Sequence, residues 1–208
     1  MKFLAKPIAL LLVSIVILSC KKEATLSEFK YSENDYPVTC DNADLDLIKE
    51  AVFSFEDDIT AHFANKGTKN LSQAYSRTVN LALYGRAKYN EIVSPHTIEI
   101  FNILKGDKQL WKADGATKTL NYNSEFIKCL GTNLSDKDLK TTFNALLTTN
   151  SMSSKLFGEP LRRKAYLAVR DKNLATYIAL DMYYAKLFDL DLNQERTSQK
   201  ATPAATNK

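Results

Sequence analysis

Three charged residues of this chain fall on the apolar faces of predicted helices, where they could do acid–base or ligand-binding chemistry. At an advance of about 100° per residue, Glu56 projects about 20° from Leu45 and Phe63. By the same projection Arg86 and Asp181 lie within the apolar faces of a second and a last predicted helix. An unpaired buried charge is costly. We therefore expect Arg86 to bridge Glu56 or Asp181 inside the fold.

This predicted polar cluster has two interpretations, and the sequence leaves both open. It could be a buried ion pair that fixes the register of the helices and has no further role. It could instead line a polar pocket for a small ligand, or hold a carboxylate with a perturbed pKa for acid–base catalysis.

Metal chemistry is weakly indicated. The chain has two histidines and no Glu-x-x-His motif of the kind that di-iron helical proteins use. His62 shares a predicted helix face with Asp58, which would make only half of a metal site. The acidic run that begins at Asp189 opens like a calcium loop, but Gln194 and Lys200 replace the required glycine and glutamate. We predict no metal and no cofactor.

Signatures of nucleophilic catalysis are missing as well. The sequence contains no Gly-x-Ser-x-Gly or His-Glu-x-x-His motif and no phosphate-binding glycine loop. We therefore name no catalytic residue. The sequence favours a non-enzymatic protein and leaves an enzyme as the alternative.

The N-terminus carries the most specific pattern in the chain. Lys2 and Lys6 precede an apolar run over residues 8–18, which is shorter than the ~20 residues needed to span a bilayer. The run ends in Ile17-Leu18-Ser19-Cys20, which matches a lipobox. The segment resembles the signal peptide of a bacterial lipoprotein.

The resemblance implies cleavage after residue 19 and acylation of Cys20, with several acyl chains, palmitate among them, anchoring the protein in the cell envelope. Stable attachment requires two or more such membrane signals. Lys21, in place of aspartate after the cysteine, implies the outer membrane by family analogy. Whether the domain faces the periplasm or the cell surface stays open.

Composition excludes some partners. The chain has 28 Lys and Arg residues against 24 Asp and Glu, and removal of residues 1–19 takes away Lys2 and Lys6, leaving 26 against 24. The mature chain is therefore nearly neutral. Because no basic stripe with interleaved aromatic residues occurs, nucleic acid is not an expected partner.

We predict four segments. Residues 1–19 form the signal peptide, 20–39 the lipid anchor and a polar tether, 40–192 a helical domain, and 193–208 a disordered tail. The domain is expected to be all-α, an antiparallel bundle of about six or seven helices, with a small β-hairpin near 109–122. Helices are expected over 44–63, 71–89, 95–105 and 124–130, from 135 onward, and over 161–172 and 174–190.

Two cysteines remain once Cys20 is lipidated. Cys40 and Cys129 form an even pair in a compartment where disulfides persist. A bridge between them would close a long loop. The alternative is that Cys129 is a free, buried cysteine beside an apolar helix stripe.

Two functions are compatible with these observations. The favoured one is an accessory or binding lipoprotein whose helical domain presents a surface, or a small pocket, to an envelope protein or a small ligand. The alternative is an enzyme or small-ligand sensor built on Glu56, Arg86 and Asp181.

Overall fold

The structure is a computed structural model that describes residues 25–192. Over this range the fold is mainly helical with one small antiparallel sheet, as predicted. Its elements are α1 (Leu45–His62), α2 (Leu71–Leu83), α3 (Tyr89–Ile92), α4 (Pro95–Leu104), β1 (Trp111–Asp114), β2 (Thr117–Leu120), α5 (Glu125–Thr132), α6 (Lys137–Thr148), α7 (Ser154–Lys164), the 3₁₀ helix η1 (Ala165–Val169), α8 (Lys172–Met182) and the 3₁₀ helix η2 (Tyr184–Asp189). The predicted signal peptide (1–19), the predicted lipidation site Cys20 and the predicted disordered tail (193–208) lie outside the described residues.

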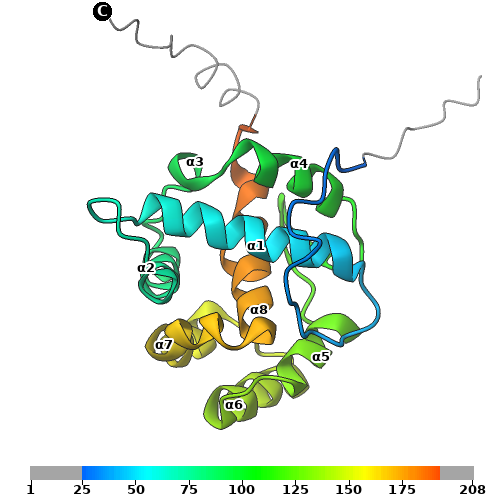
Figure 1. The fold of residues 1–208 in the computed structure, drawn as a ribbon. Helices are drawn as coiled ribbons and strands as arrows, with labels where there is room; N and C mark the ends of the chain where they lie inside the picture. Colours follow the sequence, from blue (N-terminus) through cyan, green and yellow to red (C-terminus); the bar gives the residue numbers. More distant parts are fainter. Residues whose placement is uncertain (1–24, 193–208) are drawn as a thin grey trace, which may run out of the picture.

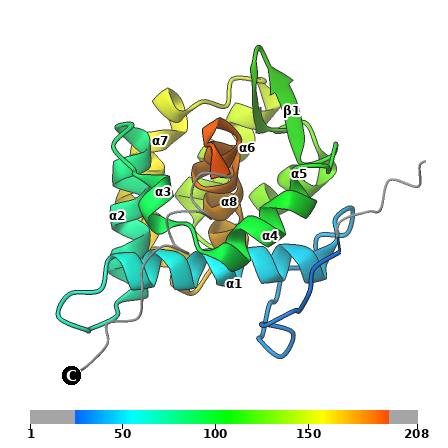
Figure 2. The same cartoon turned by 90° about the horizontal axis from the view of Figure 1, so that it is seen from above.

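Helix α8 is the centre of the fold, and the other helices pack around it (Figure 1). Its residues from Leu174 to Leu180 are all buried, so this stretch is covered on every side, which is typical of a helix enclosed by others. Helix α1 crosses α8 instead of running alongside it, and the hairpin lies on the opposite side of α8 from α1 (Figure 2). Among the described residues, no helix combines the length and apolar character needed to cross a membrane.

Helix α1 begins and ends where its sequence pattern predicts. The side chain of Asp44 accepts a hydrogen bond from the Leu47 backbone N–H at 3.1 Å, which satisfies a free amide at the helix start. Apolar residues spaced by three and four face the core. These are Ile48, Val52, Phe55 and Ile59, all fully buried.

The second helix is shorter than predicted because of Gly85. This residue adopts φ +63°, a left-handed conformation that favours glycine. The backbone N–H of Gly85 donates to Ala82 O at 3.1 Å, and that of Arg86 donates to Leu81 O at 2.8 Å. These two bonds form a Schellman motif, which ends α2 at Leu83. The predicted continuation of this helix to residue 89 is wrong, and α3 is a separate short helix.

The C-terminal helices also differ from the prediction. The chain breaks at Asp171, whose side chain accepts from the Leu174 backbone N–H at 3.0 Å and so caps α8. The helix predicted over 161–172 is therefore the end of α7 followed by η1. The helix predicted over 174–190 is α8 followed by η2.

The hairpin predicted near 109–122 is confirmed. Strands β1 and β2 pair antiparallel with Trp111 opposite Leu120 and Asp114 opposite Thr117. The two-residue turn between them contains Gly115 at φ +60°, which agrees with the turn signal in the sequence.

Residues 25–40, which we call the strap, lie against the helical domain, whereas residues 20–39 were expected to form a free polar tether. The strap runs beside α1 and α4 (Figure 1). Val38 and Cys40 are buried in the core, and the Tyr36 hydroxyl bonds Thr176 Oγ1 of α8 at 2.6 Å. The described part of the predicted tether thus belongs to the fold. The sequence does not indicate this, because the contacts of the strap are hydrogen bonds and isolated apolar anchors without a periodic pattern.

Candidate functional site

The structure separates the three residues that were predicted to form one cluster. Glu56 is buried as expected, with a side chain that is 8% exposed. Its Oε1 atom binds Lys172 Nζ at 2.6 Å and accepts a hydrogen bond from the Tyr75 hydroxyl at 2.7 Å. Lys172 Nζ also lies 4.4 Å from the centre of the Phe53 ring, a cation–π contact. The cationic partner of Glu56 is therefore Lys172 and not Arg86.

Arg86 lies on the surface. Its guanidinium carbon is 5.3 Å from the centre of the Tyr84 ring, and the residue is exposed. The predicted bridge from Arg86 to Glu56 or Asp181 is wrong because the helical projection was carried through Gly85, where the helix has already ended.

Asp181 forms a site of its own. Its carboxylate accepts hydrogen bonds from the hydroxyls of Tyr122 at 2.5 Å and Tyr177 at 3.2 Å. Burial raises the pKa of Asp181, while the Tyr122 hydroxyl, the charge of Lys186 and the Tyr177 hydroxyl oppose this shift. Asp181 also lies on the wall of a cavity of about 520 Å³. Of the predicted cluster, it is Asp181 that lines this cavity, whereas Arg86 faces solvent and Glu56 is enclosed.

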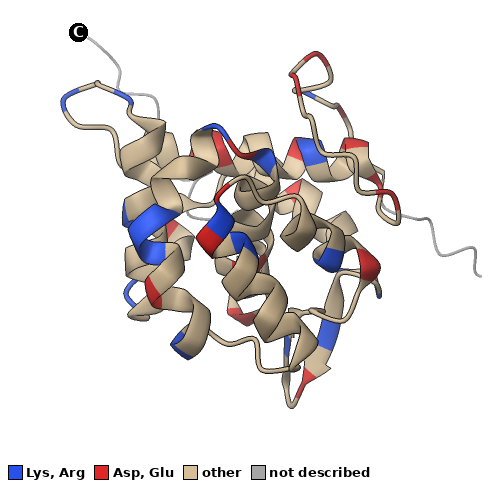
Figure 3. Cartoon of the chain, turned by 90° about the horizontal axis from the view of Figure 1, so that it is seen from below, with Lys and Arg blue, Asp and Glu red and all other residues tan. Residues whose placement is uncertain are grey.

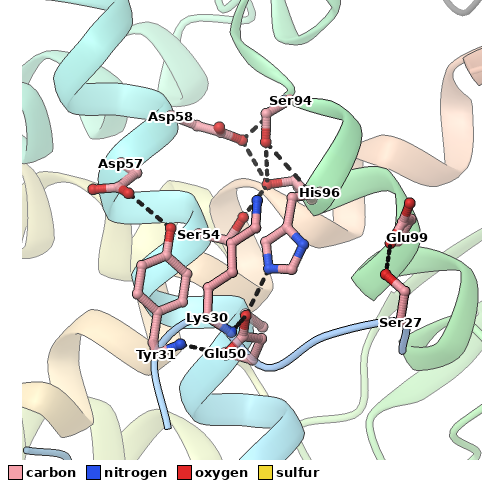
Figure 4. A network of polar contacts seen from close by, with 12 residues as sticks. Ser27, Lys30, Tyr31, Glu50, Ser54, Asp57, Asp58, Ser94, His96 and Glu99 are labelled. Atoms are coloured by element: carbon pink, nitrogen blue, oxygen red, sulfur yellow. Dashed lines mark hydrogen bonds and ion pairs between the residues drawn. The ribbon is translucent and has the colours of Figure 1, made fainter. Parts of the chain in front are cut away.

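A second polar network, which the sequence interpretation missed, joins α1 to the start of α4 (Figure 4). We call it the polar seam. It comprises Glu50, Ser54 and Asp58 of α1 together with Ser94, His96 and Thr97 at the start of α4. The three α1 residues are spaced by four and are 0%, 2% and 7% exposed, respectively. A row of polar residues at this spacing on an otherwise apolar helix was the signal available in the sequence.

Asp58 holds the N-terminus of α4 within the polar seam. Its Oδ2 atom accepts from the Ser94 backbone N–H at 3.1 Å, from Thr97 Oγ1 at 2.6 Å and from the Tyr183 hydroxyl at 2.7 Å. Burial raises the pKa of Asp58, and the hydrogen bonds from Thr97, Tyr183 and Ser94 work against that rise. A carboxylate beside a helix N-terminus is also favoured by the helix dipole.

Glu50 joins the polar seam to the strap. Its Oε1 atom accepts from the Lys30 backbone N–H at 2.7 Å, and its Oε2 atom accepts from the Tyr31 backbone N–H at 3.0 Å. The Nε2 atom of His96 lies 2.6 Å from Glu50 Oε1. A fully buried carboxylate with these partners serves as a clamp, because its oxygens are already engaged by groups of the same chain.

We expect the Glu50→Gln variant to loosen the strap while the domain stays folded. Hydrogen bonds to charged groups contribute about 1.5–3 kcal/mol each, and the Gln amide nitrogen would face backbone donors. Amide hydrogen exchange at Lys30 and Tyr31 should accelerate at least about tenfold. Hydrogen-exchange mass spectrometry over residues 25–40 measures this.

The matched control is Glu99→Gln. Glu99 also holds the strap, since it accepts from Ser27 Oγ at 2.9 Å, but this contact is exposed. The control should leave exchange at Lys30 and Tyr31 unchanged. Equal exchange in Glu50→Gln and in the unaltered chain would contradict the clamp.

His62 does not contribute to a site with Asp58. Its ring packs edge-on against Phe63, 4.7 Å between centroids, and the residue is exposed. Asp58 instead points inward to α4. Within residues 25–192, no group of three or more His, Cys, Asp or Glu side chains is arranged to hold a metal ion.

Cys40 and Cys129 form a disulfide, so the structure decides between the two states that the sequence left open. Their Cα atoms are 5.7 Å apart, within the range that disulfides occupy. The bridge ties the end of the strap to α5, and Asn133 Nδ2 lies 3.3 Å from the sulfur of Cys129.

Comparisons with protein-family models, with curated proteins and with solved structures give no match to this chain. The functional argument therefore depends on the residues and contacts described above.

Proposed function

We propose that this chain is a lipid-anchored protein of the bacterial cell envelope, held at the outer membrane, whose helical domain is a non-enzymatic binding or accessory module. The lipobox-like residues 17–20 support the location. The observation that carries the non-enzymatic assignment is the closure of two buried carboxylates, those of Glu50 and Glu56. Each carboxylate is occupied by partners of the same chain, so neither is positioned to bind or protonate a substrate.

In this proposal the helical domain lies a short distance from the membrane, because the strap that precedes it is part of the fold. Only residues 21–24 separate Cys20 from Thr25, where the described fold begins. Five extended peptide units reach at most about 18 Å. A lipid on Cys20 would therefore keep the domain close to the bilayer, where it would meet envelope proteins or their ligands.

The charge distribution favours a protein or small-molecule partner over nucleic acid. Lys and Arg segments and Asp and Glu segments are both scattered over the ribbon in the view of Figure 3. The near balance of 28 basic and 24 acidic residues also provides little long-range attraction for a polyanion.

A small-ligand sensor is the second candidate, now without the three-residue cluster first expected. Arg86 is on the surface and Glu56 is closed, but Asp181 borders a cavity of about 520 Å³. This volume is within the range of small-molecule sites, about 300–1,000 Å³.

Lipidation is tested by expressing the full-length chain in a bacterium fed an alkyne-bearing palmitate analogue. We expect labelled protein in the outer-membrane fraction. In Cys20→Ala, label and membrane attachment should both be lost, because acylation requires the thiol of Cys20.

The control is the Cys40→Ala/Cys129→Ala double variant, which should still incorporate the label. Labelling that persists in Cys20→Ala, or unlabelled protein in the soluble fraction, would reject the lipoprotein assignment.

A further inference from the structure

The cavity beside Asp181 is built from four separated parts of the chain. The hairpin forms one wall, the end of α2 and the segment that leads into α7 form another, and the end of α8 with the start of η2 forms the floor. The hairpin is on the opposite side of α8 from α1, along which the strap runs (Figure 2). A ligand in this cavity would therefore not compete with the strap.

Charged residues of both signs line this cavity. Asp181 comes from α8, Lys186 from η2, and Lys112 and Asp114 from β1. Lys112 and Asp114 are exposed, and they are two residues apart on a strand, so their side chains share one face of the hairpin. Two positive and two negative groups around one space suit a ligand that carries both charges.

Asp181 is the residue best prepared to bind a cation. Its carboxylate is fixed by the hydroxyls of Tyr122 and Tyr177, and no Lys, Arg or His nitrogen of the described chain lies within ion-pair distance of it. A carboxylate that loses solvation without gaining an ion-pair partner would be stabilised by an incoming ammonium group.

We propose that this cavity binds a small zwitterion, an amino acid or a short peptide, with its ammonium group at Asp181 and its carboxylate at Lys186 and Lys112. The assignment rests on the second candidate function, a small-ligand sensor, and names its ligand class. Ser153, Ser154 and Asn150 at the entrance to α7 supply further hydrogen-bonding groups for a peptide backbone.

A neutral sugar fits the cavity less well. Sugar-binding sites use the faces of aromatic rings, and Tyr122 is the one aromatic residue in the described lining. The Tyr122 hydroxyl is also already committed to Asp181. Methionines and small aliphatic residues, such as Met152 and Met182, fill the remaining wall and would accept short apolar side chains.

The test is isothermal titration calorimetry of the lipidated full-length mature protein in detergent. The probes are free amino acids, the dipeptide alanyl-alanine, its N-acetylated form, its C-amidated form and, as neutral sugars, glucose and N-acetylglucosamine. We expect at least one amino acid or alanyl-alanine to bind with a Kd below about 1 mM. Removal of either terminal charge should weaken binding at least about tenfold.

Two variants locate the site. Asp181→Asn should weaken the zwitterion at least about tenfold and remove the distinction between free and acetylated amines. Lys186→Gln should also weaken binding of the zwitterion, and it should remove the distinction between free and amidated carboxylates. Lys186→Gln, at a partly exposed position, also keeps the test valid should Asp181→Asn fail to fold. Asp46→Asn is the matched control, since Asp46 is exposed on α1, away from the cavity, and its variant should bind normally.

The outcomes separate the two levels of the proposal. Unchanged zwitterion binding in both cavity variants would overturn the site. Binding of a neutral sugar that Asp181→Asn abolishes, without zwitterion binding, would overturn the ligand class and keep the ligand sensor. No binding of any probe would overturn both.

Discussion

Replacement of Cys40 and Cys129 by alanine should lower the free energy of unfolding by about 4 to 5 kcal/mol in the chain-entropy description of cross-links. The two cysteines are 89 residues apart in sequence, so the bridge closes a loop that spans more than half of the described chain. Without the bridge, the unfolded chain regains the freedom that this loop closure removes. Urea unfolding, followed by circular dichroism, measures the loss.

The matched control for this experiment is Cys20→Ala, which removes a cysteine and leaves the bridge. Its unfolding midpoint should stay unchanged. A loss below about 1 kcal/mol in the double variant would contradict the expected size of the effect. Titration of the denatured, unreduced protein should find no free thiol at Cys40 or Cys129.

The second large effect is expected for Lys172→Met. This change leaves the Glu56 carboxylate buried with only the Tyr75 hydroxyl as a partner. Removal of one member of a buried ion pair costs about 3–5 kcal/mol, because the remaining charge stays unsolvated. Urea unfolding at neutral pH should therefore show a large drop in the free energy of unfolding.

Two further variants show whether the loss of stability comes from the unpaired carboxylate of Glu56. The double variant Glu56→Leu/Lys172→Met has no unpaired carboxylate and should recover much of the lost stability. Lys164→Met removes a lysine from a more exposed pair with Asp136 and Asp138, and should cost at most about 1 kcal/mol. Equal losses in Lys172→Met and Lys164→Met would contradict a buried ion pair at Glu56.

Local signals in the sequence predicted much of the fold. Asp44 and Ser94 cap helices α1 and α4 because their side-chain oxygens accept from backbone amides within the first turn. The Gly115 turn fixed the hairpin. Each of these features depends on residues that are a few positions apart, so the local sequence pattern is sufficient to predict it.

The candidate site was harder to predict because its partners are distant in sequence. Lys172 is 116 positions from Glu56, and no periodicity links the two. A helical projection brings Arg86 onto the apolar face only if the helix continues through Gly85, a helix-ending residue that is visible in the sequence. The burial of Glu56 was therefore predictable, and its partner was not.

The strap was misjudged for a different physical reason. Glu50 holds it through the backbone N–H groups of Lys30 and Tyr31, and every residue except proline carries such a group. Hydrogen bonds to backbone N–H groups do not depend on residue type, so the amino-acid composition does not reveal them. The polar composition of the strap therefore predicts a free tether, although the segment is bound.

The strap and the bridge together determine how the domain would carry mechanical load. A pull applied to the chain before Thr25 reaches the exposed hydrogen bond from Ser27 to Glu99 first and then the hydrogen bonds of Glu50, and all of these can break and re-form. Beyond them the load arrives at Cys40, where it divides between the main chain into α1 and the covalent link to Cys129 on α5. The hydrogen bonds of Glu50 would thus break reversibly under load. The remaining force would be shared by α1 and α5, so α1 alone would not be pulled from the core.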